Sequence, residues 1–208
     1  MGSNHGHHPG DLSEGEVRAR ALESLLREKG VIQGDVVDEI VAVYSSDIGP
    51  LNGARAVAKA WTDPEFHDRL LAHATDALAE IGIGGLQGEY MVAVQNTESV
   101  HHVVVCTLCS CYPWPVLGLP PAWYKDAPYR SRVVREPRAV LAEFGTHLEP
   151  GVEVQVWDSN SEIRYLVIPR RPDGSENLTE DELAALVTRD SMIGVTVLPA
   201  VGAAVGAA

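Results

Sequence analysis

Hydrophobic residues in the first eighty positions recur at helical spacing, which predicts a series of amphipathic helices. Ser13 and Glu16 form a capping-box pattern ahead of an apolar stripe that ends at Gly30. Asp35 is expected to cap a second helix that stops before Pro50, and a short helix over about residues 53–60 follows.

A stronger helix start is expected at Thr62-Asp63-Pro64-Glu65, where Pro64 occupies the first helical position. One apolar stripe continues from there to Gly82 and predicts a single helix; it consists of Phe66, Leu70, Ala74, Leu78 and Ile81. Residues 82–88 contain four glycines in seven positions, so this segment is expected to be a loop.

From Tyr90 onward the pattern changes to that of β-strands. Residues 90–94 and 100–105 are rich in β-branched side chains, and residues 152–157 and parts of 163–168 alternate between apolar and polar. Six prolines between Pro113 and Pro137 exclude long regular elements there. Thr179 and Glu182 predict the start of a last helix that reaches about Arg189.

These elements predict an α+β fold in which a helical N-terminal arm precedes a layered α/β domain. We expect a flexible tail at residues 1–12, the arm at 13–81, the α+β domain at 82–198 and a flexible tail of Ala, Val and Gly at 199–208. The apolar stripes of the arm are expected to be covered by a second chain, with folding back onto the arm's own domain as the alternative.

Composition narrows the possible partners. The chain has 16 basic and 29 acidic residues, a formal net charge of −13, which argues against nucleic acid or an anionic membrane as a partner. It contains no apolar run of membrane-spanning length, and we expect no secretory signal because polar residues and histidines follow Met1. With three free thiols, the expected compartment is the cytoplasm.

All three cysteines lie within six positions, in the sequence Cys106-Thr-Leu-Cys109-Ser-Cys111. Thiols this close can converge on one metal ion, and the amide nitrogens of Ser110 and Cys111 lie in the chelate ring between two of the sulfurs. Three sulfurs and two amides would leave one octahedral position open, as in catalytic metal sites. A zinc or redox site, with His101 and His102 as further ligands, and inert thiols remain alternatives.

The segment from Val103 to Lys125 resembles the metal-binding segment of the nitrile hydratase alpha subunit. The resemblance covers about residues 13–197. It continues in Gly49-Pro50 and in the segments 58–65, 82–89, 129–138, 156–159 and 186–195. Thr107 and Tyr112 are similar to the cobalt branch of this family, whereas the iron branch has serine at the position of Thr107.

The resemblance implies an enzyme that hydrates nitriles to amides at one low-spin, non-corrin Co³⁺ ion per alpha chain, with iron as the alternative metal. Cys106 would be the unmodified axial ligand, Cys109 a sulfinic acid and Cys111 a sulfenic acid. Two arginines of a beta subunit would hold the added oxygens. The expected partners are that beta subunit, in a heterodimer or heterotetramer, an activator or metallochaperone for cobalt insertion, and the small molecules nitrile and water.

The family also implies roles around the claw, by which we mean residues 106–111. Ser110 and Cys111 are expected to act in catalysis as well as in binding the metal, Gln87 matches a glutamine near the metal, and Trp114 is expected to line the substrate pocket. For each, a loop, packing or size role remains the alternative. The nucleophile stays open between a hydroxide on the metal, a second water and the sulfenate oxygen of Cys111.

Two further groups of charged residues could act near the claw. Glu162 and Arg164 resemble a pair that supports the metal loop, with a surface ion pair as the alternative. The arginines of residues 130–138 could supply cations to the claw, but their spacing favours salt bridges at a subunit boundary; they are Arg130, Arg132, Arg135 and Arg138.

Two other functions are alternatives to nitrile hydration. A thiocyanate hydrolase subunit shares the cobalt claw but takes an anionic substrate, and in that family a basic residue replaces Trp114. Trp114 therefore favours a neutral nitrile. A metal-storage protein or metallochaperone could use His5, His7 and His8 as ligands, although these histidines also fit a solvated tail that binds no metal.

Overall fold

The structure is a computed structural model that describes residues 14–33, 38–39, 41–48, 50–85, 90–109 and 111–202. The chain divides into two compact units, residues 1–42 and 43–208, and each is described by itself. The division falls inside the helical arm predicted for residues 13–81, since the helices after residue 50 belong to the second unit.

In the first unit, α1 (Glu14–Glu28) confirms the first predicted helix. Arg18 and Arg27 form i,i+4 ion pairs along it, and Gly30 follows it with a φ of +66°. None of its residues is buried. The predicted capping residues Ser13 and Asp35 lie outside the described residues.

The second unit begins with four helical segments: η1 (Val43–Ile48), α3 (Leu51–Thr62), α4 (Pro64–Ala72) and α5 (Ala74–Glu80). η1 is a π-helix, which the apolar pattern did not predict. α3 is the predicted short helix, extended at both ends and largely buried. It approaches its neighbours closely at Gly53, where an added Cβ would lie 2.7 Å from the sulfur of Met192.

The predicted start at Pro64 is confirmed, because the Asp63 carboxylate accepts a hydrogen bond from the amide of Phe66 at 3.0 Å. The single helix predicted as far as Gly82 is wrong. His73 leaves the helical region, with φ −146° and ψ 64°, and divides the stripe between α4 and α5. Burial of the stripe survives this break, since Phe66, Leu70, Ala74 and Leu78 are all in the core.

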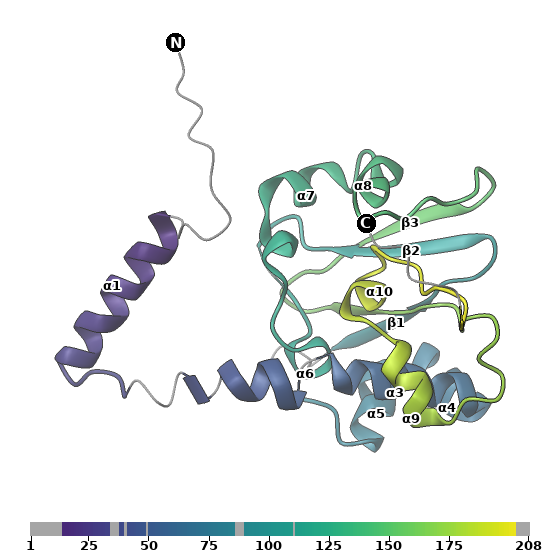
Figure 1. The fold of residues 1–208 in the computed structure, drawn as a ribbon, viewed down its shortest axis with the longest axis horizontal. Coiled ribbons are helices and arrows are strands. Elements are labelled where there is room, and N and C mark those ends of the chain that lie inside the picture. The colour runs from purple at the N-terminus through teal and green to yellow at the C-terminus, as the bar shows by residue number, and fades with distance from the viewer. Residues whose placement is uncertain are drawn as a thin grey trace, which may run out of the picture. The chain divides into compact units, whose positions relative to one another are not determined.

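Four strands form two small parallel sheets: β1 (Met91–Gln95) pairs with β4 (Arg164–Ile168), and β2 (Val100–Val105) pairs with β3 (Glu153–Asp158). Helices α4 and α5 contact β1, and α8 (Pro137–Glu143) contacts β3. Figure 1 shows the two sheets between these groups of helices. The α+β class with a layered domain is confirmed, with the hydrophobic core between the layers.

The proline-rich segment is organised by its prolines. It forms three short helices, α6 (Trp114–Leu117), η2 (Ala122–Lys125) and α7 (Ala127–Arg132). α6, α7 and α8 each have a proline within their first two positions, where the missing N–H has no helical partner to lose. The segment therefore changes direction repeatedly after the claw.

The last predicted helix is also divided. Thr179 and Glu182 form the predicted capping box of α9 (Glu180–Leu186), which confirms its start. Val187 is then extended, and a second capping box of Thr188 with Ser191 begins α10 (Arg189–Ile193). Within the described part of the chain, every helix is too short or too polar to cross a bilayer.

Candidate metal centre

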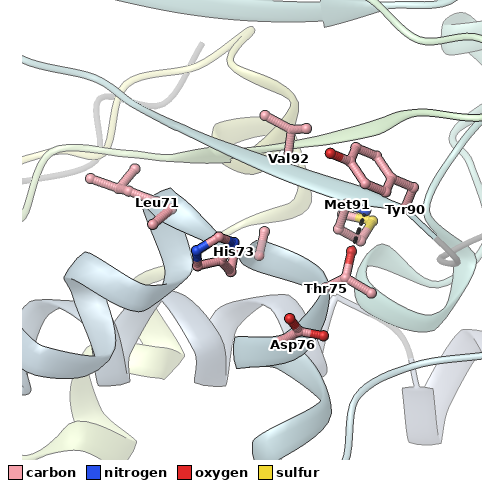
Figure 2. Close-up of a pocket in the computed structure, with 9 residues that line it drawn as sticks. Leu71, His73, Thr75, Asp76, Tyr90, Met91 and Val92 are labelled. Carbon is pink, nitrogen blue, oxygen red and sulfur yellow. Dashed lines mark hydrogen bonds between the residues drawn. The ribbon is translucent and has the colours of Figure 1, made fainter.

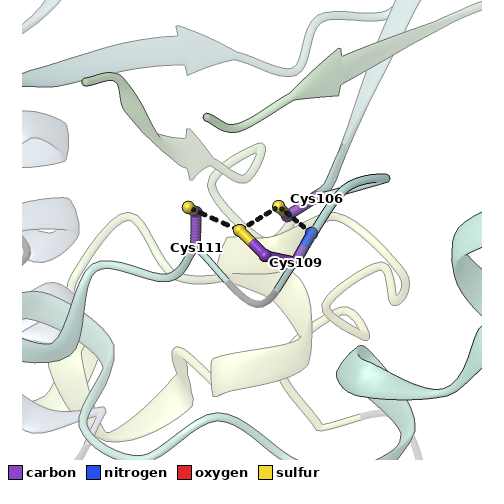
Figure 3. A group of neighbouring side chains, drawn as sticks. All are labelled: Cys106, Cys109 and Cys111. Carbon is purple, nitrogen blue, oxygen red and sulfur yellow. Dashed lines mark hydrogen bonds between the residues drawn. The ribbon is translucent and has the colours of Figure 1, made fainter. Parts of the chain in front are cut away.

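The thiols of Cys106, Cys109 and Cys111 meet at one point (Figure 3). The sulfur of Cys109 lies 3.4 Å from that of Cys106 and 3.0 Å from that of Cys111, and all three lie within 4.8 Å of one another. Within the described residues, this is the one group of at least three histidine, cysteine or acidic side chains that could hold a metal. The predicted convergence is present.

The strand β2 positions the first cysteine. Cys106 directly follows β2 and is fully buried, while Cys111 is buried at the other end of the loop. Between them the loop is exposed, with Leu108 85% accessible to solvent, and the amide of Cys109 donates to the sulfur of Cys106 at 3.3 Å. Two of the donors are therefore shielded from water, and the third faces outward.

The end of β3 holds the start of the loop. Asp158 pairs with Val105 in the parallel sheet, so its carboxylate lies beside the residue before Cys106. One carboxylate oxygen accepts from the amide of Thr107 at 2.9 Å, and the other accepts from the Thr107 hydroxyl at 2.5 Å. A serine at position 107 could donate the same two hydrogen bonds. These contacts therefore do not explain why the cobalt branch has threonine at this position.

Aromatic residues of the proline-rich segment support the claw from the buried side. The hydroxyl of Tyr124 donates to the carbonyl of Cys111 at 3.1 Å, and the hydroxyl of Tyr129 donates to the carbonyl of Val104 at 2.7 Å. Burial raises the pKa of both tyrosines, so they remain protonated donors. Tyr112 packs edge to face against Tyr124, with ring centroids 5.1 Å apart.

An arginine of this chain also reaches the claw. Arg130 donates to the carbonyl of Cys109 at 2.8 Å. The other arginines of residues 130–138 bind elsewhere: Arg132 pairs with Glu136 and Glu143, while Arg135 and Arg138 donate to carbonyls outside the claw. The sequence placed Arg130 among four candidate arginines but favoured salt bridges at a subunit boundary for all of them, because spacing along the chain does not show which arginine faces the loop.

The surroundings of Cys111 disfavour its thiolate. Burial, a hydrogen bond with Cys109 and the negative potential of Cys106 raise the pKa of the Cys111 thiol to about 12, and Arg164 opposes them. Without a cation, a thiolate is therefore unfavourable here. Three converging soft donors that need a positive charge fit a thiolate-bound transition metal.

The structure describes only some of the residues predicted to act around the claw. Ser110 and Gln87 lie outside the described residues. Trp114 is half-buried at the start of α6, with its ring centroid 5.5 Å from that of Tyr44. Arg164 is buried, and its guanidinium donates a hydrogen bond to the backbone carbonyl of Asn160. Glu162 precedes β4 and is exposed.

The two histidines before the claw have other partners. His101 contacts the carbonyl of Gly194 at 2.7 Å, and the indole of Trp157 donates to His102 at 2.8 Å. Neither belongs to the group of possible metal ligands. The structure therefore does not bring these histidines together with the three sulfurs.

The surface also contains a cavity away from the claw. A cavity of about 330 Å³ opens between the junction of α4 with α5 and the start of β1. His73, Thr75, Asp76 and Tyr90 lie around it (Figure 2), and the Thr75 hydroxyl accepts a hydrogen bond from the amide of Met91 at 2.8 Å. Its walls contain none of the three cysteines.

Residues 13–196 match the family model of the nitrile hydratase alpha chain. The chain is 57% identical over 189 residues to the low-molecular weight cobalt-containing nitrile hydratase subunit alpha of Rhodococcus rhodochrous, covering 91% of each chain. It is 60% identical over 179 residues to the cobalt-containing nitrile hydratase subunit alpha of Pseudonocardia thermophila, covering 86% of this chain and 88% of the relative.

Two further comparisons bear on the alternatives. The thiocyanate hydrolase subunit gamma of Thiobacillus thioparus is more distant, at 41% identity over 198 residues, covering 90% of this chain and 81% of the relative. A solved double mutant of the Fe-type nitrile hydratase from Comamonas testosteroni Ni1 superposes with a TM-score of 0.82 at 39% identity, covering 95% and 97% of the two chains. This chain belongs to the nitrile hydratase alpha-chain family.

Proposed function

We propose that this chain is the alpha subunit of a cobalt-containing nitrile hydratase, which adds water to the C≡N bond of a nitrile and yields an amide. The observation that carries the proposal is the convergence of three thiols within 4.8 Å in a member of this family. Cobalt is favoured because two relatives with 57% and 60% identity are named as cobalt-containing.

Residues of this chain would divide the work. Cys106, Cys109 and Cys111 would hold the ion, together with the amide nitrogens of Ser110 and Cys111. When bound, a trivalent ion supplies Lewis acidity that makes a nitrile carbon more electrophilic. Ser110 and Gln87 would orient a water molecule. Trp114 would form an apolar wall of the substrate pocket. Cys109 would be a sulfinic acid and Cys111 a sulfenic acid.

A beta subunit completes the proposed enzyme. The relatives are themselves named as subunits, and α1 has exposed apolar side chains of the kind that protein–protein interfaces cover. Arginines of that partner would hold the oxidised cysteines. We also propose that the assembly resides in the cytoplasm and that an activator protein inserts the cobalt.

The proposal is tested on the chain co-expressed with its beta subunit. We expect about one cobalt ion per alpha chain, amide formed from a simple nitrile, and masses about 32 Da and 16 Da above the thiol form at Cys109 and Cys111. Replacing any one of the three cysteines by alanine should remove both cobalt and activity, because a donor is lost. Iron or zinc at that stoichiometry in active enzyme, or full cobalt in a cysteine variant, would contradict it.

Thiocyanate hydrolysis is the second candidate, supported by the 41% identical gamma subunit. An assay with both substrates distinguishes the two functions, because a nitrile is neutral and thiocyanate is an anion. Trp114 offers no charge to an anion, so we expect turnover of the nitrile and none of thiocyanate. The reverse result would assign the chain to the other activity.

A further inference from the structure

Arg130 lies where it can act on the claw. It is part of α7, and the neighbouring Tyr129 fixes that helix by donating to the carbonyl of Val104, two residues before Cys106. From this position a terminal nitrogen of the Arg130 guanidinium donates to the carbonyl of Cys109 at 2.8 Å. The helix that holds the end of β2 therefore also holds the middle of the claw.

The described residues place no carboxylate beside the charge of Arg130. Among the described residues, no acidic side chain lies within ion-pair distance of Arg130, and its buried Nε has no hydrogen-bond acceptor. Arg132, two residues away, shows the ordinary arrangement, with Glu136 and Glu143 at 2.6 and 2.7 Å. A half-buried guanidinium without a counterion is costly unless a negative group faces it.

The contacted carbonyl belongs to a particular peptide group. It is the peptide that joins Cys109 to Ser110, and the nitrogen of Ser110 is one of the proposed amide ligands. When such a nitrogen binds a metal as an anion, amide resonance shares its negative charge with the carbonyl oxygen. Arg130 donates to that same oxygen, where a charge-assisted hydrogen bond is shorter and stronger than a neutral one.

We propose that Arg130 is a positioning residue of the metal centre, whose positive charge stabilises the peptide between Cys109 and Ser110 in its metal-binding form. The inference rests on the proposed function, since it presupposes a metal in the claw. It assigns to the alpha chain part of the positive charge that a claw of three thiolates and two amide anions requires. The arginines proposed for the beta subunit face the oxidised sulfurs, whereas Arg130 faces the backbone.

Three variants of the alpha–beta complex, expressed with cobalt, separate charge from packing. Arg130→Gln keeps a donor but removes the charge, and Arg130→Lys keeps the charge. Arg135→Gln is the matched control, because Arg135 is an exposed arginine nearby that donates to the carbonyl of Ser131. The measurements are cobalt per alpha chain, the thiolate-to-cobalt absorption band, the loss of cobalt to a chelator and the melting temperature.

We expect Arg130→Gln to lose cobalt about 10-fold faster or more, the range typical of residues that support metal ligands, with a shifted absorption band. Arg130→Lys should recover most of the retention, and Arg135→Gln should match the wild type. Wild-type retention and spectrum in Arg130→Gln would overturn the inference. Equal loss in the lysine and glutamine variants at an unchanged melting temperature would also overturn it, because charge would then be irrelevant.

If Arg130→Gln does not accumulate, Arg130→Lys carries the test alone. Near-wild-type retention in that variant supports a role for the charge, and rapid loss in a complex of normal melting temperature refutes it. Failure of the proposed function is distinguishable from these outcomes. In that case the wild-type complex itself would contain no cobalt, whichever residue occupies position 130.

Discussion

The indole N–H of Trp157 donates to Nδ1 of His102 at 2.8 Å, which makes that nitrogen an acceptor and leaves the proton on Nε2. His101 has the same tautomer, because its Nε2 contacts the carbonyl of Gly194 at 2.7 Å and its Nδ1 faces the amide nitrogen of Asn96 at 3.3 Å. Both rings are therefore neutral, and they connect β2 to β3 and to the end of α10.

This network predicts that stability falls in mild acid. Burial lowers the pKa of His101, and burial also lowers that of His102. Below the unfolded value of about 6.5 the unfolded chain binds more protons than the native one, so the free energy of unfolding decreases as the pH falls. Above that value the contribution is fully present.

Urea unfolding of the complex between pH 8 and 5.5 measures this effect. His101→Gln should flatten the pH dependence below about pH 6.5, because the buried titrating group is gone. His147→Gln is the control, since His147 is exposed. An unchanged slope in His101→Gln would show that other groups cause the acid sensitivity.

Gly194 should tolerate no side chain. Its φ is +88°, and an added Cβ would lie 1.9 Å from the carbonyl oxygen of His102, a backbone atom that shifts less easily than the end of a side chain. Gly145 has a similar φ of +78° with nothing within 4 Å. Gly145→Ala should cost about 1 kcal/mol from backbone strain. Gly194→Ala should add about 1–3 kcal/mol from overpacking.

The urea midpoints of the two glycine variants provide the comparison, since both share the strain of a left-handed backbone. Equal destabilisation would mean that the region around the His102 carbonyl relaxes to admit a methyl group.

The contact of Thr107 with Asp158 should control metal retention. Asp158→Ala removes both acceptors, and hydrogen bonds to charged groups contribute about 1.5–3 kcal/mol each. We expect faster loss of cobalt to a chelator in Asp158→Ala and a smaller effect in Thr107→Val, which keeps the amide bond. Thr107→Ser should retain cobalt, because both donors remain.

Asp173→Ala, at an exposed position, is the control for loss of an acidic residue. Iron in place of cobalt in Thr107→Ser would show that the threonine methyl selects the metal by another route.

The part of the predicted arm from Val17 to Tyr44 should be needed for assembly with the beta subunit. Val17, Leu22 and Leu25 are exposed on α1, as expected for a surface that a partner covers. Deleting residues 1–12 should leave co-purification intact, whereas deleting residues 1–44 should abolish it. Leu25→Asp should weaken it. We expect the full interface to exceed roughly 2,000 Å², typical of obligate assemblies. Stable complex formation by the chain lacking residues 1–44 would refute the prediction.

Local signals predicted much of this molecule. Caps at Asp63 and Thr179 gave helix starts because capping depends on side chains within three residues. The three cysteines identified the site because all its thiols lie in one short segment. In contrast, the breaks at His73 and Val187 occur without Gly or Pro, and neither sequence position has a residue that ends helices by itself.

Long-range relationships could not be predicted in the same way. The pairing of β1 with β4 and of β2 with β3 is parallel, and the alternation of side chains does not encode strand direction. Arg130 reaches the claw from 21 residues downstream of Cys109. One sequence contains many arginines at comparable distances, so only the fold shows which of them meets the loop.

The support of the claw by β3 also sets an order of events during synthesis. Asp158 lies 51 residues after Thr107, so all three thiols leave the ribosome before the carboxylate that shapes their loop exists. At ordinary elongation rates this interval lasts about 3–10 seconds. During that time the nascent chain presents an unshaped thiol cluster to any soft metal or oxidant it meets. Correct loading therefore requires either delivery after β3 has emerged or protection of the cysteines until then.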